Sequence, residues 1–269
     1  MSANISIGQY YPVNSIIHKL DPRVKILTTM FYLILLFNVT NFLSYGVVIL
    51  FTLFVVKLSN VPIMKILKGL KSIFFILIFT SLLNIFFAQG ETVLLEFGRF
   101  SITLEGVVLA IKTSIRLILL ISFSSILTLT TNPIELTNAL EYLLAPLKKI
   151  KVPAHEIAMM MTIALRFIPT LMEELDRIMK AQMARGSEFD TGNLTQKAKS
   201  LVPVLVPLFV SSFRRADELA MAMEARCYRG DINRTKMKKL KYGKIDNYVI
   251  VVCVLLSITV YFVNKINFW

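Results

Sequence analysis

The chain has 269 residues, of which 55% are hydrophobic and 17% charged, and its mean hydropathy is +0.66. This composition excludes an ordinary soluble domain and is typical of an integral membrane protein. The net charge of +13 would suit a nucleic-acid-binding protein, but basic loops on the cytoplasmic face of a membrane explain it without nucleic acid.

The first apolar stretch lies between Lys25 and Lys57 and contains no charged residue. As one helix it would be about 46 Å long, whereas the hydrocarbon core of a bilayer is roughly 30 Å thick. Because lysines at both ends favour the cytoplasmic side, we expect two short crossings joined by an outer turn at residues 38–41. The N-terminus would then be cytoplasmic. Residues 1–23 lack the pattern of a cleavable signal peptide, so we expect insertion through the spans themselves.

A third crossing is predicted at residues 72–90, which carry no charge. It would lead to an external loop that is acidic, with Glu91, Glu96 and Glu105 against the single cation Arg99.

A fourth crossing is predicted from about residue 106 to residue 131, and it contains Lys112 and Arg116 on one helical face. Charged residues inside a membrane pack or snorkel, or they face a partner. The sequence leaves both interpretations open for this pair.

Residues 132–246 differ in character, since they contain most of the acidic and basic residues and six prolines. We interpret them as a cytoplasmic region between the spans of residues 1–131 and a fifth span within residues 247–269. Leu171, Leu175 and Ile178 follow helical spacing and predict an amphipathic helix. A second helix is predicted to begin in the apolar residues 201–213, which are too short to cross, and to end in a polar segment near residue 226. The predicted fold class is therefore an all-α integral membrane protein with about five transmembrane helices and long amphipathic cytoplasmic helices.

No motif for catalysis or for a cofactor emerges from the sequence. The glycines do not form a phosphate-binding loop, so any ATP would be used by a partner. His155-Glu156 begins like a zinc-protease helix, but Met159 stands where the second histidine would be needed. Cys227 and Cys253 are too far apart in the sequence to indicate a disulfide framework or a metal pair. We therefore expect no catalytic residue, no metal and no bound cofactor.

A short signature recurs near the ends of the two cytoplasmic helices, as AQMARG and AMEARC. One offset aligns Asp176 with Asp217, Ala184 with Ala225 and Arg185 with Arg226. A guanidinium stays charged, forms forked hydrogen bonds and is favoured at the negative end of a helix dipole. One such arginine would be an ordinary helix end. Two matching copies predict a pair of docking tips, formed by these residues: Ala184, Arg185, Gly186, Ala225, Arg226 and Cys227.

The chain resembles the transmembrane (T) component of energy-coupling factor transporters. The resemblance rests on LDPRVK, LEGVVLAIKTSIRL, LTLTTNP, ALRFIP and the two arginine signatures in this order, and it covers most of the chain after residue 100. It implies a scaffold whose long coupling helices dock on two ABC-type ATPase subunits, together with a separate substrate-binding membrane subunit, in the cell membrane. The family usually has glycine where this chain has Cys227, so a close approach at the second tip is less well supported.

Two alternatives come from other classes of protein. Lys112 and Arg116 would suit a self-sufficient permease with its own solute pathway. His155-Glu156 and the serines at 122, 124 and 125 would suit an intramembrane enzyme. Neither accounts for two matched helix ends.

Overall fold

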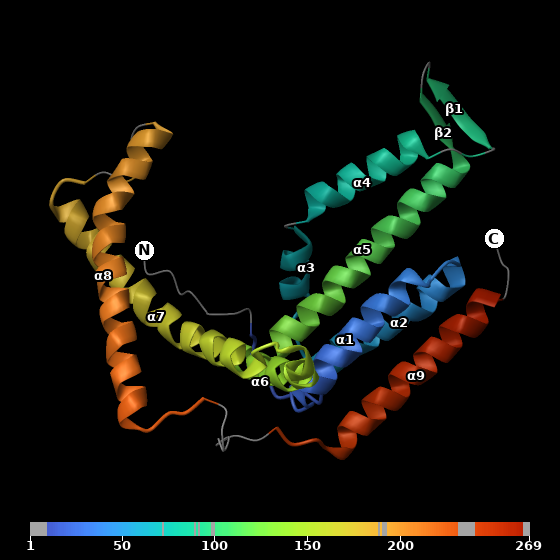
Figure 1. Cartoon of the computed structure of the whole chain (residues 1–269). Helices are drawn as coiled ribbons and strands as arrows, with labels where there is room; N and C mark the ends of the chain where they lie inside the picture. Colours follow the sequence, from blue (N-terminus) through green and yellow to red (C-terminus); the bar gives the residue numbers. More distant parts are fainter. Residues whose placement is uncertain are drawn as a thin grey trace. The chain divides into compact units, whose positions relative to one another are not determined.

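The computed structural model describes residues 10–71, 73–88, 90, 92–97, 100–187, 189, 193–230 and 240–265 (Figure 1). They divide into two compact units. The first unit contains residues 10–139 and 240–265, and the second contains residues 140–230. Each unit is described by itself.

Among the described residues, the first unit contains five helices that precede the second unit in the chain and one helix that follows it. They are α1 (Pro22–Phe37), α2 (Phe42–Ser59), α3 (Ile63–Lys71), α4 (Phe74–Phe87), α5 (Leu104–Thr130) and α9 (Lys244–Lys265). Helix α5 packs against α1, α2, α3 and α4, and α9 packs against α1 and α2. The core between them includes a stacked pair of rings, Tyr32 and Phe123, whose centroids lie 3.9 Å apart.

The start of α1 shows how the sequence sets a helix boundary. The carboxylate of Asp21 accepts a 2.9 Å hydrogen bond from the backbone N–H of Arg23, and Pro22 occupies the first turn. Aspartate at the N-cap followed by proline is a strong helix start, because proline loses no hydrogen bond there. The LDPR segment therefore begins this helix.

The membrane class predicted from the sequence is confirmed. Helices α2, α5 and α9 are each long and apolar enough to cross a bilayer, and α3 with α4 would make a fourth crossing as one broken span. Helix α1 has 16 residues and is about 24 Å long, which is shorter than the hydrocarbon core. The turn predicted at residues 38–41 lies between α1 and α2 as expected. The number and direction of the crossings stay predictions.

Two strands interrupt the helical pattern where a loop was predicted. Strand β1 (Val93–Phe97) pairs in antiparallel fashion with β2 (Phe100–Thr103), directly before α5. Thr103 then caps α5 by accepting a 3.2 Å hydrogen bond from the N–H of Gly106. Of the four charges expected in the loop, Glu91 and Arg99 lie outside the described residues.

The second unit is built around two long helices. Helix α6 (Pro133–Leu144) leads into it from the first unit, followed by a 3₁₀ turn (Ala145–Ile150), α7 (Ala154–Ala184) and α8 (Leu194–Ala225). Helix α8 continues through Pro203 and Pro207, so the apolar and polar parts of the second predicted helix form one element. Helices α7 and α8 pack against each other. The carboxylate of Glu174 on α7 binds both Arg215 and Ser211 on α8, each at 2.6 Å.

Candidate functional site

The first predicted tip is the C-terminal end of α7. Ala184 is its last helical residue, Arg185 is the cap, and Gly186 follows with φ at +90°. The N–H of Gly186 donates to the carbonyl of Met183 and the N–H of Ser187 donates to that of Gln182, both at 3.0 Å. These paired bonds form a Schellman motif, in which the residue after the cap takes a left-handed conformation.

The second predicted tip, at the end of α8, has the same backbone geometry. Ala225 is the last helical residue, Arg226 is the cap, and Cys227 follows with φ at +55°. The N–H of Cys227 donates to Glu224 at 2.8 Å, and the N–H of Tyr228 donates to Met223 at 3.0 Å. The sequence signature thus corresponds to a repeated helix end, in which the arginine is the cap of each helix.

Both cap arginines present their guanidinium groups to the surroundings. Arg185 and Arg226 are exposed, and among the described residues neither makes an ion pair or a side-chain hydrogen bond. Each lies at the negative end of a long helix dipole, which favours a cation there. Figure 1 shows that α7 and α8 cross and that their C-terminal ends lie apart, so the two tips occupy different places on the second unit.

A contact that the sequence did not reveal joins the α8 tip to α7 through Tyr228. The hydroxyl of Tyr228, two residues beyond Arg226, donates to the sulfur of Met159 at 2.8 Å and lies 3.4 Å from Nε2 of His155. The other ring nitrogen of His155 lies 2.9 Å from a carboxylate oxygen of Glu141. These residues are far apart in the chain, so no periodic pattern could have brought them together.

His155, which the enzyme alternative would use, therefore has a structural role as a buried link between two other side chains. His155 is 3% exposed and sits between Glu141 and Tyr228 at the foot of α7. Within the part of the chain that the structure describes, no group of three or more His, Cys, Asp or Glu side chains could hold a metal ion.

The charged pair in α5 contacts the turn between α1 and α2 and the first residues of α2. Arg116 donates to the hydroxyl of Tyr45 at 3.0 Å and to the carbonyl of Val39 at 3.3 Å. The Lys112 ammonium lies 5.0 Å from the centroid of the Phe42 ring, a cation–π contact. These contacts favour the packing interpretation of the pair over a solute pathway.

Known proteins resemble this chain over nearly its whole length. Residues 13–237 match the cobalt transport protein family, CbiQ. The energy-coupling factor transporter transmembrane protein EcfT of Ruminiclostridium cellulolyticum is 57% identical over 246 residues, which is 91% of this chain and 92% of the relative. The proteins of the same name from Clostridium kluyveri and Bacillus subtilis are 54% and 47% identical, and the alignments cover 99% and 98% of this chain and 98% and 100% of the relatives.

The family resemblance expected from the sequence motifs is thereby confirmed. The match includes α7 and most of the first unit, and it reaches past the α8 tip. By its membrane helices and by these relatives, the chain belongs to the EcfT family, the transmembrane components of energy-coupling factor transporters.

Proposed function

We propose that this chain is the coupling subunit of an ATP-driven importer. Its two helix tips dock on two cytoplasmic ATPase subunits, and its spans and amphipathic helices hold a separate membrane subunit that binds a vitamin or another micronutrient. ATP is bound and hydrolysed by the partners, and this chain transmits their closure as a rigid-body movement of α7 and α8.

The observation that carries the proposal is the repetition of one helix-end geometry. Two helices of about equal length end in the same Schellman motif, and both present an exposed cap arginine without a partner among the described residues. A cation of this kind is suited to a carboxylate or to backbone carbonyls in a cleft of another protein. The duplicated tip therefore suits a pair of similar partners.

The orientation follows from the same proposal. ATPase subunits work in the cytoplasm, so α7, α8 and the N-terminus lie on the cytoplasmic side of the cell membrane. The lysines in the last turn of α2 and within α3, including Lys57 and Lys68, agree with the positive-inside rule.

The test is to replace both cap arginines in the assembled transporter. Arg185→Ala with Arg226→Ala removes two charge-assisted contacts, each worth roughly 2 to 5 kcal/mol if it is buried at an interface. We expect the ATPase subunits to dissociate during purification in mild detergent, or ATP hydrolysis to continue without uptake.

A matched control keeps the same loss of charge on the same two helices. Arg177 on α7 and Arg214 on α8 are also exposed but lie away from the ends, so Arg177→Ala with Arg214→Ala should leave assembly and uptake close to normal. If the tip variant assembled and transported as well as this control, the docking role of Arg185 and Arg226 would be wrong.

A further inference from the structure

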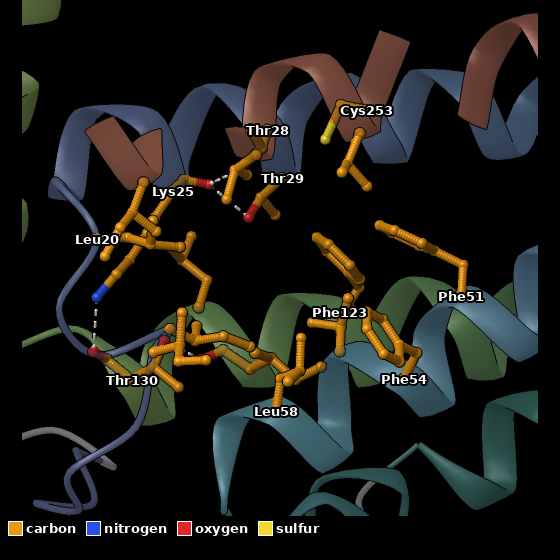
Figure 2. A pocket seen from close by; sticks show the side chains of 18 of the residues that line it. Leu20, Lys25, Thr28, Thr29, Phe51, Phe54, Leu58, Phe123, Thr130 and Cys253 are labelled. Atoms are coloured by element: carbon orange, nitrogen blue, oxygen red, sulfur yellow. Dashed lines mark hydrogen bonds between the residues drawn. The ribbon is translucent and has the colours of Figure 1, made fainter. Parts of the chain in front are cut away.

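The first unit contains an apolar cavity that opens on the outer surface of the helix bundle. It has a volume of about 240 Å³ and is lined by side chains of the segment before α1 and of α1, α2, α5 and α9. Figure 2 shows the rings of Phe51, Phe54 and Phe123 on one side of it. Phe54 and Val252 are both more than 40% exposed, so the cavity communicates with the surface that faces lipid.

The lysine and threonine side chains around this cavity donate hydrogen bonds to backbone carbonyls. The ammonium of Lys25 donates to the carbonyls of Thr130 at 2.9 Å and His18 at 3.2 Å. The hydroxyls of Thr28 and Thr29 both donate to the carbonyl of Lys25, at 3.2 and 2.7 Å (Figure 2). The space that remains is suited to a hydrocarbon chain and offers little to a polar solute.

A second cavity of about 520 Å³ adjoins the first and is basic. The two share Ile16, Phe54 and Leu58 as lining residues, and the second is also lined by Lys19 and Lys57. Lys19 precedes α1 and Lys57 lies in the last turn of α2, so both lie at the same end of the α1–α2 pair. Lysines at the end of a span are expected at the boundary between membrane and water.

The two lysines lack a compensating charge. Both are exposed, and among the described residues neither forms an ion pair with a carboxylate. Two like charges on the wall of one cavity concentrate a positive potential there and attract an anion. A basic pocket between transmembrane helices at the membrane surface is a recurrent site for acidic lipid head groups.

We propose that the two cavities together bind one anionic phospholipid. An acyl chain fills the apolar cavity between α1, α2, α5 and α9, and the phosphate lies between Lys19 and Lys57. The lipid would thereby join α9 to the first two helices. The proposal concerns the first unit alone and is independent of the docking of ATPases on the second.

The test measures lipid binding to the purified chain in mild detergent by native mass spectrometry. The probes are phosphatidylglycerol and phosphatidylcholine with the same two oleoyl chains. Phosphatidylglycerol should be retained more strongly, and the preference should shrink with added salt. Glycerophosphoglycerol, which is the head group without chains, should not displace it.

Two pairs of variants separate the contribution of the head group from that of the chain. A lysine near a membrane surface contributes on the order of five-fold in affinity for an acidic lipid, so Lys19→Gln with Lys57→Gln should weaken phosphatidylglycerol binding roughly 25-fold. Phosphatidylcholine binding should weaken much less, because the choline cation already balances the charge of its phosphate. The control is Lys68→Gln with Lys71→Gln, two exposed lysines of α3 that line neither cavity. For the chain, Val252→Phe should fill the apolar cavity and weaken both lipids, whereas Val251→Phe, its exposed neighbour outside the lining, should weaken neither.

Thermal unfolding in lipid-free detergent establishes that each variant is folded before its lipid binding is compared. Equal retention of the two lipids by the wild-type chain would overturn the proposal. The proposal would also be overturned if the two lysine pairs lost phosphatidylglycerol binding to the same extent, or if Val252→Phe and Val251→Phe weakened lipid binding equally.

Discussion

Gly186 and Cys227 occupy the same position in the two helix ends, the first residue beyond the cap, and both adopt a left-handed backbone conformation with φ at +90° and +55°. Glycine takes this conformation without steric cost, whereas a residue with a Cβ atom is strained there by about 1 kcal/mol. The unusual residue of the second signature therefore has a conformational consequence in the helix end itself, before any partner approaches.

Cys227→Gly should stabilise the end of α8 by about 1 kcal/mol, because it removes the strain of a left-handed cysteine. The measurement is amide hydrogen exchange in the last turn of α8, which should slow relative to the wild type. Cys227→Ala is the control, since alanine keeps the Cβ atom and should bring no gain.

The reciprocal change tests the same explanation at the other tip. A Cβ atom added at Gly186 would meet no atom within 4 Å, so Gly186→Ala has no clash to complicate it. Its cost of about 1 kcal/mol should come from the backbone conformation alone and should appear as faster exchange in the last turn of α7. Unchanged exchange in both variants would contradict the strain.

Tyr228→Phe should loosen the α8 tip, because it removes the hydroxyl that contacts Met159 and His155. Hydrogen bonds of this kind contribute about 1 kcal/mol. Cys227 is exposed and adjacent, while Cys253 is buried, so a nitroxide on Cys227 in a Cys253→Ser background reports the motion of the tip. The electron paramagnetic resonance spectrum of this label should show greater mobility in Tyr228→Phe than in the chain that keeps Tyr228.

Two further variants locate the cause of that mobility. His155→Ala should mobilise the label in the same way, since it removes the ring that links Glu141 to Tyr228. Tyr248 is an exposed tyrosine of α9, so Tyr248→Phe should leave the mobility of the label unchanged. A label equally mobile in all three variants would mean that the tip is not anchored through Tyr228.

Asn264→Ala should destabilise the first unit by about 2 kcal/mol. The Asn264 side chain accepts a 2.6 Å hydrogen bond from Ser44 and donates one of 2.7 Å to the carbonyl of Asn38, and so ties the end of α9 to the turn between α1 and α2. Thermal unfolding in detergent measures the loss. Thr259→Ala is the control, because the Thr259 hydroxyl is exposed and, among the described residues, bonds only to the carbonyl of Leu255 within α9. Equal midpoints of thermal unfolding in the two variants would contradict a stabilising role for the hydrogen bonds of Asn264.

Sequence reasoning located the features that depend on composition and charge. The charge-free stretch between Lys25 and Lys57 predicted the turn that the structure places between α1 and α2, and the paired arginine signatures predicted two like helix ends. Both follow from local physics, namely burial in lipid and the helix dipole.

What the sequence did not reveal depends on contacts between distant segments. In the hairpin before α5, β1 carries no clear alternation of apolar and polar residues, whereas β2 does alternate, as Phe100, Ser101, Ile102 and Thr103, but over only four residues. The second cytoplasmic helix was predicted to begin in residues 201–213, whereas α8 begins at Leu194 and continues through Pro203 and Pro207. The contacts of Tyr228 with His155 and of Asn264 with Ser44 join residues that only the fold brings together.

The pairing of α7 with α8 should weaken in acid through Glu174. The Ser211 hydroxyl and the Arg215 guanidinium lower the pKa of Glu174, because both stabilise its charged form. The usual pKa of a glutamate is about 4.3, so in the unfolded state this carboxylate takes up its proton first as the pH falls. The stabilisation is therefore complete above about pH 5 and is lost as the pH falls through the lower pKa of the folded state.

Glu174→Gln removes this dependence while it keeps the shape of the side chain. Because Arg215 is partly exposed, the ion pair and the hydrogen bond together should contribute only about 1 kcal/mol. Thermal midpoints measured between pH 6.5 and pH 3.5 should fall more steeply for the wild type than for Glu174→Gln. Glu173→Gln, at the exposed neighbouring position, should keep the wild-type slope, and if its slope matched that of Glu174→Gln instead, the acid sensitivity would not originate from the contact between α7 and α8.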